Sequence, residues 1–213
     1  MNPLRHVVIE GPIGVGKTTL ARRLADAMDA DLLLEQPQDN PFLARYYQDP
    51  RHAALPAQLF FLFQRVQQLQ GLAQPGLFHS ARVCDYLFDK DRLFAELTLD
   101  AEEFELYQKI SQRLPVAPPA PDLVVYLQAP VEVLLRRIAQ RGIAYEQHIT
   151  AAYLRRIMDA YTRLFHGYTA APLLIVNAAQ MDPIHNDAHF HLLLAHMRQA
   201  GPGRHYFNPG ALA

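Results

Sequence analysis

Short apolar segments alternate along the chain with longer segments in which apolar residues recur every three or four positions. The short segments predict strands at 5–10, 31–34, 82–85, 122–127 and 172–177. The longer segments predict helices at 17–28, 40–48, 52–72, 90–96, 100–113, 130–140, 149–166 and 183–198. This alternation is typical of an α/β protein, and we expect a three-layer sandwich in which helices flank a five-stranded parallel sheet.

A single domain with a lid accounts for the length of the chain. Its 213 residues are enough to bury a substantial core, and no shift in composition marks a second domain. We assign residues 1–200 to the domain. Within it, we assign about residues 136–146 to the lid. The final segment, 201–213, is rich in glycine and proline, so we expect a loose C-terminal tail there.

Charge and cysteine content exclude several classes of protein. The formal net charge is -1, which gives no general attraction for a nucleic-acid polymer or an acidic membrane. The longest apolar runs, such as 59–63, are far below the roughly 18 residues that suggest a membrane span. Cys84 is the only cysteine, which excludes an internal disulfide and a cysteine-based zinc site. Because the N-terminus also lacks the features of a signal peptide, we expect a cytoplasmic protein.

Residues 11–18 match the Walker A pattern and lie between a predicted strand and a predicted helix. The amides of such a loop point into one cavity, and the helix N-terminus adds partial positive charge there. We expect Lys17 to reach the β- and γ-phosphates of ATP, and Thr18 to bind Mg²⁺. The predicted nucleotide site contains Gly11, Pro12, Ile13, Gly14, Val15, Gly16, Lys17, Thr18 and Thr19.

The phosphate loop, or P-loop, does not identify the acceptor, since GTPases, ATPases and small-molecule kinases share it. No Asn-Lys-x-Asp sequence follows, which disfavours a guanine-reading switch GTPase. Glu35 follows the predicted strand 31–34 and therefore emerges at the sheet edge that carries the P-loop. A carboxylate there could accept the proton of an attacking hydroxyl. Its position alone is equally compatible with a surface acid in a turn.

From Val7 to about Val176 the sequence resembles the deoxynucleoside kinase family, especially its bacterial deoxyadenosine and deoxyguanosine kinase branch. The matching segments are Ile9-Glu10-Gly11, Glu35-Gln36-Pro37, Asn40-Pro41-Phe42-Leu43, and the spacing of Tyr47, Gln58 and Arg65. The resemblance implies that Glu35 is the general base, that Tyr47 holds the sugar 3′-hydroxyl, and that Gln58 and Arg65 face the nucleobase.

The positions and hydrogen-bonding groups of Gln58 and Arg65 are compatible with contacts to a nucleobase. Gln58 and Arg65 are seven residues apart, so they share one face of the predicted helix 52–72. A glutamine amide offers both a donor and an acceptor to a nucleobase edge. Polar residues are common in this helix, however, and without the resemblance Gln58 would be assigned to a solvated face.

The resemblance also assigns residues around the phosphates. It implies that Asp85 lies near Mg²⁺, that Asp91 works with Arg65, and that Glu146 is the acidic residue of the lid. Asp91 also fits the ordinary preference for an acid at a helix N-terminus. The resemblance further implies that Arg137 and Arg141 clamp the γ-phosphoryl group.

Two positions depart from the family pattern, because Tyr86 and Ile143 stand where it has arginines. Such arginines neutralise charge on a transferring phosphoryl group. The sequence offers Arg45, Arg82 and Arg92 as replacements without ranking them.

The sequence, together with this resemblance, thus predicts a P-loop kinase that uses ATP and Mg²⁺ to phosphorylate the 5′-hydroxyl of a deoxynucleoside in nucleotide salvage. The bacterial branch that it resembles implies a preference for purines. The resemblance implies a homodimer formed through helices. Two alternatives are also compatible with the sequence. One is a nucleoside monophosphate kinase of the thymidylate type, and the other is a nucleotide-binding protein with reduced catalysis.

Overall fold

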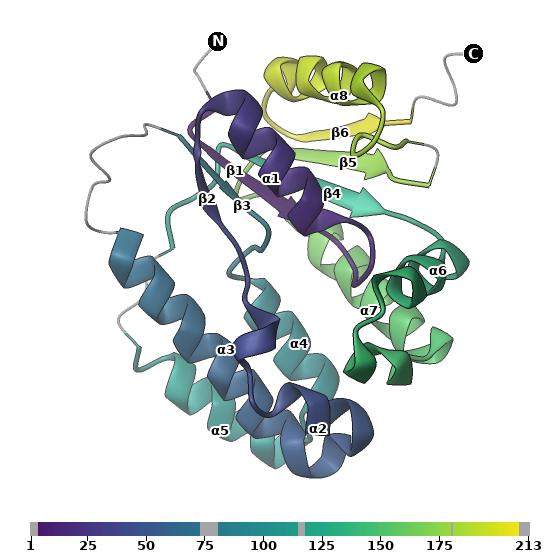
Figure 1. Cartoon of the computed structure of the whole chain (residues 1–213). Coiled ribbons are helices and arrows are strands. Elements are labelled where there is room, and N and C mark those ends of the chain that lie inside the picture. The colour runs from purple at the N-terminus through teal and green to yellow at the C-terminus, as the bar shows by residue number, and fades with distance from the viewer. Residues whose placement is uncertain (1–3, 73–80, 115–117, 180, 209–213) are drawn as a thin grey trace.

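The computed structural model describes residues 4–72, 81–114, 118–179 and 181–208. Its centre is a parallel sheet with the strand order β2-β3-β1-β4-β5-β6 (Figure 1). The strands are β1 (His6–Glu10), β2 (Asp31–Leu33), β3 (Arg82–Cys84), β4 (Leu123–Gln128), β5 (Leu173–Asn177) and β6 (Arg204–Phe207). The first five agree with the predicted strands to within one residue at each end, which confirms the α/β class.

The sheet has six strands, so the prediction of five was wrong. The additional strand, β6, lies within the segment expected to be a loose tail. It pairs in parallel with β5, with Leu173 opposite Arg204 and Val176 opposite Phe207. Four residues with a single buried apolar side chain, Phe207, give no clear strand pattern in the sequence. Because β6 pairs with β5, the folded unit extends beyond residue 200, where we predicted that the domain ends.

The helices follow the predicted order with small shifts. They are α1 (Lys17–Met28), α2 (Leu43–Gln48), α3 (Pro50–Leu72), α4 (Lys90–Thr98), α5 (Ala101–Ser111), α6 (Val131–Arg141), α7 (Ala151–His166) and α8 (Asp187–Gln199). Two short 3₁₀ helices, η1 (Pro37–Asp39) and η2 (Ala144–His148), complete the set. No helix within the described ranges is long and apolar enough to cross a membrane.

Local side-chain hydrogen bonds explain where two helices begin later than predicted. Before α2, the Asn40 side chain accepts a hydrogen bond from the backbone amide of Phe42, 3.0 Å away, which keeps this turn out of the helix. Before α8, the Asn186 side chain accepts from the backbone amide of His189 at 3.1 Å and caps the helix. Both helices therefore start after an asparagine.

Alternating side chains of β1 join the sheet to both layers of helices. Val7 and Ile9 are fully buried in a core cluster to which α1 and α8 contribute. Val8 points to the other face and belongs to a cluster with residues of α4 and α7. Burying each such side chain contributes roughly 1.5–3 kcal/mol, so β1 is held firmly between the two layers.

Helices α2, α3 and α5 extend beyond the sheet, below it in Figure 1. Leu62 and Val66 of α3 pack with Ala95 of α4 and Tyr107 of α5 in a separate buried cluster. This cluster fixes α3 beside the carboxyl ends of β2 and β3. The polar face of α3 thereby reaches the same edge of the sheet as the P-loop.

Candidate active site

The P-loop connects β1 to α1 in a backbone conformation that requires glycine. Gly11, Gly14 and Gly16 have φ values of +146°, +82° and +104°, a region in which side chains are strained. A Cβ atom on Gly14 would lie 2.9 Å from the carbonyl oxygen of Leu134 in α6. The loop is therefore packed closely against α6, which fixes the direction of its amides.

Lys17 and Thr18 begin α1 directly after this loop. The Nζ atom of Lys17 donates to the carbonyl oxygens of Gly11 at 2.8 Å and Pro12 at 3.2 Å, so the side chain folds over the loop. Burial, and then the positive charge of Lys90, lower the pKa of Lys17 to about 8. An anion beside Lys17 would stabilise its charged form.

A hydroxyl and a carboxylate meet next to the loop. The Thr18 hydroxyl donates to Oδ2 of Asp85 at 2.5 Å, and Oδ1 of Asp85 accepts from the backbone amide of Glu35 at 2.7 Å. This pair of oxygen ligands fits Mg²⁺, which takes one or two protein oxygens and completes its shell with phosphates and water. In the described part of the chain, no group of three or more His, Cys, Asp or Glu side chains is placed to hold a metal.

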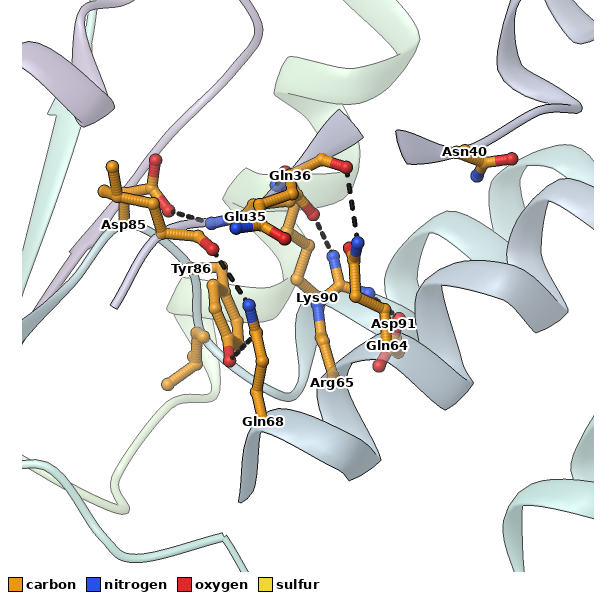
Figure 2. Close-up of polar contacts among 12 residues, drawn as sticks. Glu35, Gln36, Asn40, Gln64, Arg65, Gln68, Asp85, Tyr86, Lys90 and Asp91 are labelled. Carbon is orange, nitrogen blue, oxygen red and sulfur yellow. Dashed lines mark hydrogen bonds and ion pairs between the residues drawn. The ribbon is translucent and has the colours of Figure 1, made fainter. Parts of the chain in front are cut away.

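Glu35 lies beyond the end of β2 and pairs with two buried cations (Figure 2). Its Oε1 atom accepts from Nη2 of Arg65, and its Oε2 atom lies 2.9 Å from Nζ of Lys90. Burial alone would raise the pKa of Glu35, but the charges of Lys90 and Arg65 outweigh burial and lower the pKa to about 2. The carboxylate is therefore ionised at neutral pH and can accept a proton.

Arg65 links this carboxylate to a second one. Its Nη1 atom pairs with Oδ1 of Asp91, and the side chains of both residues are almost fully buried. Asp91 belongs to the first turn of α4, yet its side chain faces α3, so it is not an exposed helix-end acid. Within the described structure, Nε of Arg65 and Oδ2 of Asp91 are buried without a hydrogen-bond partner.

A cavity of about 130 Å³ brings most of the predicted site residues together. Its lining includes Ile13, Gly14, Lys17, Thr18, Glu35, Tyr47, Gln58, Arg65, Asp85, Arg141 and Glu146. Gln58 is 5% exposed and thus not on a solvated face. The Tyr47 ring stacks on Tyr145 at 5.9 Å between centroids and meets Tyr153 edge-on at 6.2 Å. Burial raises the pKa of Tyr47, so its hydroxyl stays neutral.

The two arginines predicted for the lid have different surroundings. Arg141, at the end of α6, pairs with Glu146 at 2.6 Å, and both residues line the cavity. Arg137 donates instead to the carbonyl oxygens of Val15 at 3.1 Å and Ala178 at 3.0 Å, and it is not among the described residues that line the cavity. In this conformation Arg137 stabilises the P-loop through the Val15 carbonyl and does not face the cavity.

Several residues of the site had no assigned role from the sequence. Lys90 and Tyr153 line the cavity, and the buried Glu10 carboxylate accepts from the Gly11 and Leu87 amides, both at 2.8 Å. A family segment that includes Glu10 was visible in the sequence, whereas Lys90 stands among Asp89, Asp91 and Arg92 and looks like part of a solvated surface.

A P-loop at the end of the central strand β1, with a carboxylate beyond the end of β2 across the same cavity, defines a P-loop kinase. The family model for deoxynucleoside kinases matches residues 7–200 of the chain. The chain therefore belongs to the deoxynucleoside kinase family, and it is a phosphotransferase that acts on deoxynucleosides.

Individual relatives agree with this assignment. The deoxyguanosine kinase of Bacillus subtilis is 32% identical over 204 residues, which cover 93% of this chain and 99% of that protein. The deoxyadenosine kinase of Dictyostelium discoideum is 30% identical over 188 residues, 84% of this chain and 74% of that protein. Among solved structures, deoxyadenosine kinase from M. mycoides with bound dATP has a TM-score of 0.77 at 20% identity, over 90% of this chain and 98% of that chain. The last comparison supports the fold.

Proposed function

We propose that the protein transfers the γ-phosphoryl group of ATP to the 5′-hydroxyl of a purine deoxynucleoside in the presence of Mg²⁺, as a step of nucleotide salvage. The observation that carries this proposal is that Lys17 and Thr18 of the P-loop face Glu35 across one cavity. A phosphate donor held at the loop and a hydroxyl held at Glu35 would therefore meet in it.

The loop residues 11–19 would hold the donor. Their amides and the start of α1 suit an anion, and Lys17 would exchange its loop carbonyls for phosphate oxygens. Thr18 and Asp85 would hold Mg²⁺, which supplies charge neutralisation to the phosphates when bound. The bond between Thr18 and Asp85 keeps these two oxygen ligands together before the donor arrives.

Glu35 would act as the general base. The 5′-oxygen of the acceptor forms a bond to the γ-phosphorus, the bond between that phosphorus and the leaving oxygen of the donor breaks, and the hydroxyl proton passes to Glu35. A carboxylate with a depressed pKa is a weak base. Its main contribution is therefore to orient the hydroxyl and to take the proton late in the transfer.

Four residues of the acceptor side would select the nucleoside. Tyr47 offers a neutral hydroxyl for the sugar, and Gln58 offers a donor and an acceptor for the base edge. Arg65 lines the cavity, and its buried pair with Asp91 would hold the guanidinium in place for the base. The purine preference is supported by relatives named deoxyguanosine kinase and deoxyadenosine kinase.

The ion pair between Arg141 and Glu146 suggests a change at the lid when substrates bind. Arg141 would leave Glu146 for the γ-phosphoryl group, and Glu146 would then turn to the acceptor. The cavity of about 130 Å³ is smaller than the ~300 Å³ at the lower end for small-molecule sites, which agrees with an opening of the lid when substrates bind. Arg137 would keep the P-loop in place during this change.

An acceptor that already carries a phosphate is less compatible with the charges present. Arg65 and Lys90 pair with Glu35, and Arg141 pairs with Glu146. These pairs would have to break before the cations could hold an acceptor phosphate, which disfavours a kinase of the thymidylate type.

We also propose that the protein is a cytoplasmic homodimer. The dimer rests on the family resemblance, and the cytoplasmic location agrees with a buried free thiol at Cys84. Light scattering coupled to size exclusion chromatography would test the dimer.

The decisive experiment for the activity is transfer of radiolabelled phosphate from ATP to a panel of the four deoxynucleosides and their monophosphates. We expect labelled 5′-monophosphates from deoxyadenosine and deoxyguanosine, with at least about tenfold lower kcat/KM for pyrimidines. Labelling of monophosphates alone would indicate the thymidylate-type activity. Tight ATP binding without transfer to any acceptor would refute the proposal.

A further inference from the structure

The transferring phosphoryl group needs positive charge from the protein, and position 86 does not provide it. Tyr86 is 4% exposed, and its hydroxyl donates to Oε1 of Gln68 in α3 at 2.6 Å (Figure 2). The side chain is uncharged and is fixed toward α3. Any cation that takes over the role of the family arginine at this position must therefore come from another residue.

The three arginines that the sequence offers as replacements are poorly placed for this role. Arg92 pairs with Glu96 and has a side chain that is 71% exposed. Arg82 is the first residue of β3, so it lies at the amino ends of the strands, whereas the P-loop lies at their carboxyl ends. Arg45 is an exposed residue of α2, with its guanidinium over the Phe42 ring at 5.8 Å.

Lys90 is placed where the charge is needed. It is the first residue of α4, is 6% exposed, and lines the cavity together with Lys17 and Thr18. Its Nζ atom lies 2.9 Å from Oε2 of Glu35, the carboxylate that would receive the proton. Lys90 therefore adjoins the proposed general base in the cavity that the P-loop also lines.

The loop that carries Lys90 is tied to the P-loop through a buried acid. Glu10, the last residue of β1, accepts from the amide of Leu87 through Oε1 and from the amide of Gly11 through Oε2. The Tyr161 hydroxyl also donates to Oε2 of Glu10, at 2.7 Å. One carboxylate thus fixes the chain before Lys90 relative to the start of the phosphate loop.

The charge on Lys90 persists in this buried position. Burial acts to lower the pKa of Lys90, but the charges of Glu35 and Glu10 outweigh it, so the pKa is raised. A second ammonium group, that of Lys17, lines the same cavity. Two buried like charges repel each other, and an anion placed between them relieves that repulsion.

We propose that Lys90 is a catalytic residue whose ammonium group stabilises the phosphoryl group as it moves from the donor to the acceptor. Before transfer, the ammonium pairs with ionised Glu35. As the hydroxyl proton passes to Glu35, the carboxyl loses its charge, and the ammonium turns to the oxygens of the phosphoryl group that is in transfer between donor and acceptor. Lys90 forms and breaks no covalent bond, and its own protons stay in place. Proton transfer to Glu35 thereby releases the ammonium group that the transferring phosphoryl group needs.

The first test compares Lys90→Met with Lys109→Met, which removes a lysine whose side chain is 63% exposed in a surface pair with Glu105. We expect Lys90→Met to lower kcat by about a hundredfold or more, with both KM values within about threefold of wild type. The kcat and KM values of Lys109→Met should match those of wild type. A kcat for Lys90→Met within about threefold of wild type would overturn the proposal. If Lys90→Met does not fold, Lys90→Gln takes its place, with the same two outcomes.

A second test separates an action on the phosphoryl group from mere positioning of Glu35. Lys90→Met is combined with Glu35→Gln, which removes the carboxylate that Lys90 holds. If Lys90 contacts the phosphoryl group, the double variant should be at least about tenfold slower than Glu35→Gln alone. Equal rates for the double variant and Glu35→Gln would show that Lys90 acts only through Glu35, which contradicts the proposal.

The inference rests on the proposed function, and the two would fail differently. A wild-type protein that transfers no phosphate to any deoxynucleoside contradicts the proposed function itself. A fully active wild type with an equally active Lys90→Met variant contradicts only the role of Lys90.

Discussion

Replacing Arg65 with methionine perturbs the buried charge cluster at its centre. The Arg65 side chain is 4% exposed and pairs with Glu35 and with Asp91, whose side chain is 3% exposed. The rings of Phe61 and Tyr86 lie 5.4 and 5.2 Å from its Cζ atom. Methionine fills much of the same space without charge. The variant leaves Glu35 its pair with Lys90, but Asp91 becomes a buried carboxylate that has lost its ion pair.

The expected effect follows from the cost of an isolated buried charge. Because removing one partner of a buried pair costs about 3–5 kcal/mol, Arg65→Met should lower the free energy of unfolding by that amount. The matched control is Arg92→Met, since Arg92 pairs with Glu96 at the surface and such pairs are worth about 0–1 kcal/mol. Adding Asp91→Leu to Arg65→Met should recover most of the loss, because an apolar replacement of a whole buried pair is often neutral.

Urea unfolding followed by far-ultraviolet circular dichroism measures these differences in a chain without tryptophan. At roughly 2–4 °C per kcal/mol for a protein of this size, Arg65→Met should also lower the Tm by about 6–20 °C. The cost assigned to the isolated Asp91 charge is refuted if the free energies of unfolding of Arg65→Met and Arg92→Met differ by less than about 1 kcal/mol. It is also refuted if Asp91→Leu makes the Arg65→Met protein still less stable.

Three further predictions concern the loop and the base. Glu35→Gln should lower turnover at least about a hundredfold while calorimetry still detects deoxynucleoside binding, and near-normal turnover would exclude Glu35 as the base. The pairs that hold the pKa of Glu35 at about 2 stabilise the fold fully above its ordinary pKa of 4.5, and this stabilisation is lost as pH falls toward 2. As pH falls from 5, the free energy of unfolding should therefore decrease more steeply for wild type than for Glu35→Gln. Parallel curves of unfolding free energy against pH for the two proteins would contradict this. Gly14→Ala, with φ at +82° and a Cβ 2.9 Å from the Leu134 carbonyl oxygen, should weaken ATP binding at least about tenfold, whereas unchanged affinity would contradict the packing described for the loop.

The parts of the site that the sequence predicted are those fixed by local chemistry. The P-loop is visible because glycine, lysine and threonine occupy set positions between a strand and a helix. Glu35 is visible because it follows a predicted strand whose carboxyl end must lie at the same edge of the sheet as the loop. Strands and helices with several apolar residues on one face were placed correctly for the same reason.

The parts that could not be predicted depend on contacts between distant segments. Lys90 has charged neighbours in the sequence, and only the packing of α4 against α3 and α7 buries its side chain beside Glu35. Arg137 fits a phosphate clamp by its position, but its guanidinium reaches two backbone carbonyls instead. β6 is a strand because β5 presents an edge to it, which no local pattern reveals.

The strand order determines when the phosphate-binding loop can take shape during synthesis. β1 leaves the ribosome before β3 and β4, yet it lies between them in the sheet. Gly11 packs against the carbonyl of Leu127 in β4, and contacts so distant in sequence form late, because a long segment must close first. A nascent chain that ends before β4 therefore carries the complete nucleotide-binding sequence without a nucleotide-binding site. Ribosome-bound chains released at successive lengths should acquire affinity for ATP only after β4 has emerged.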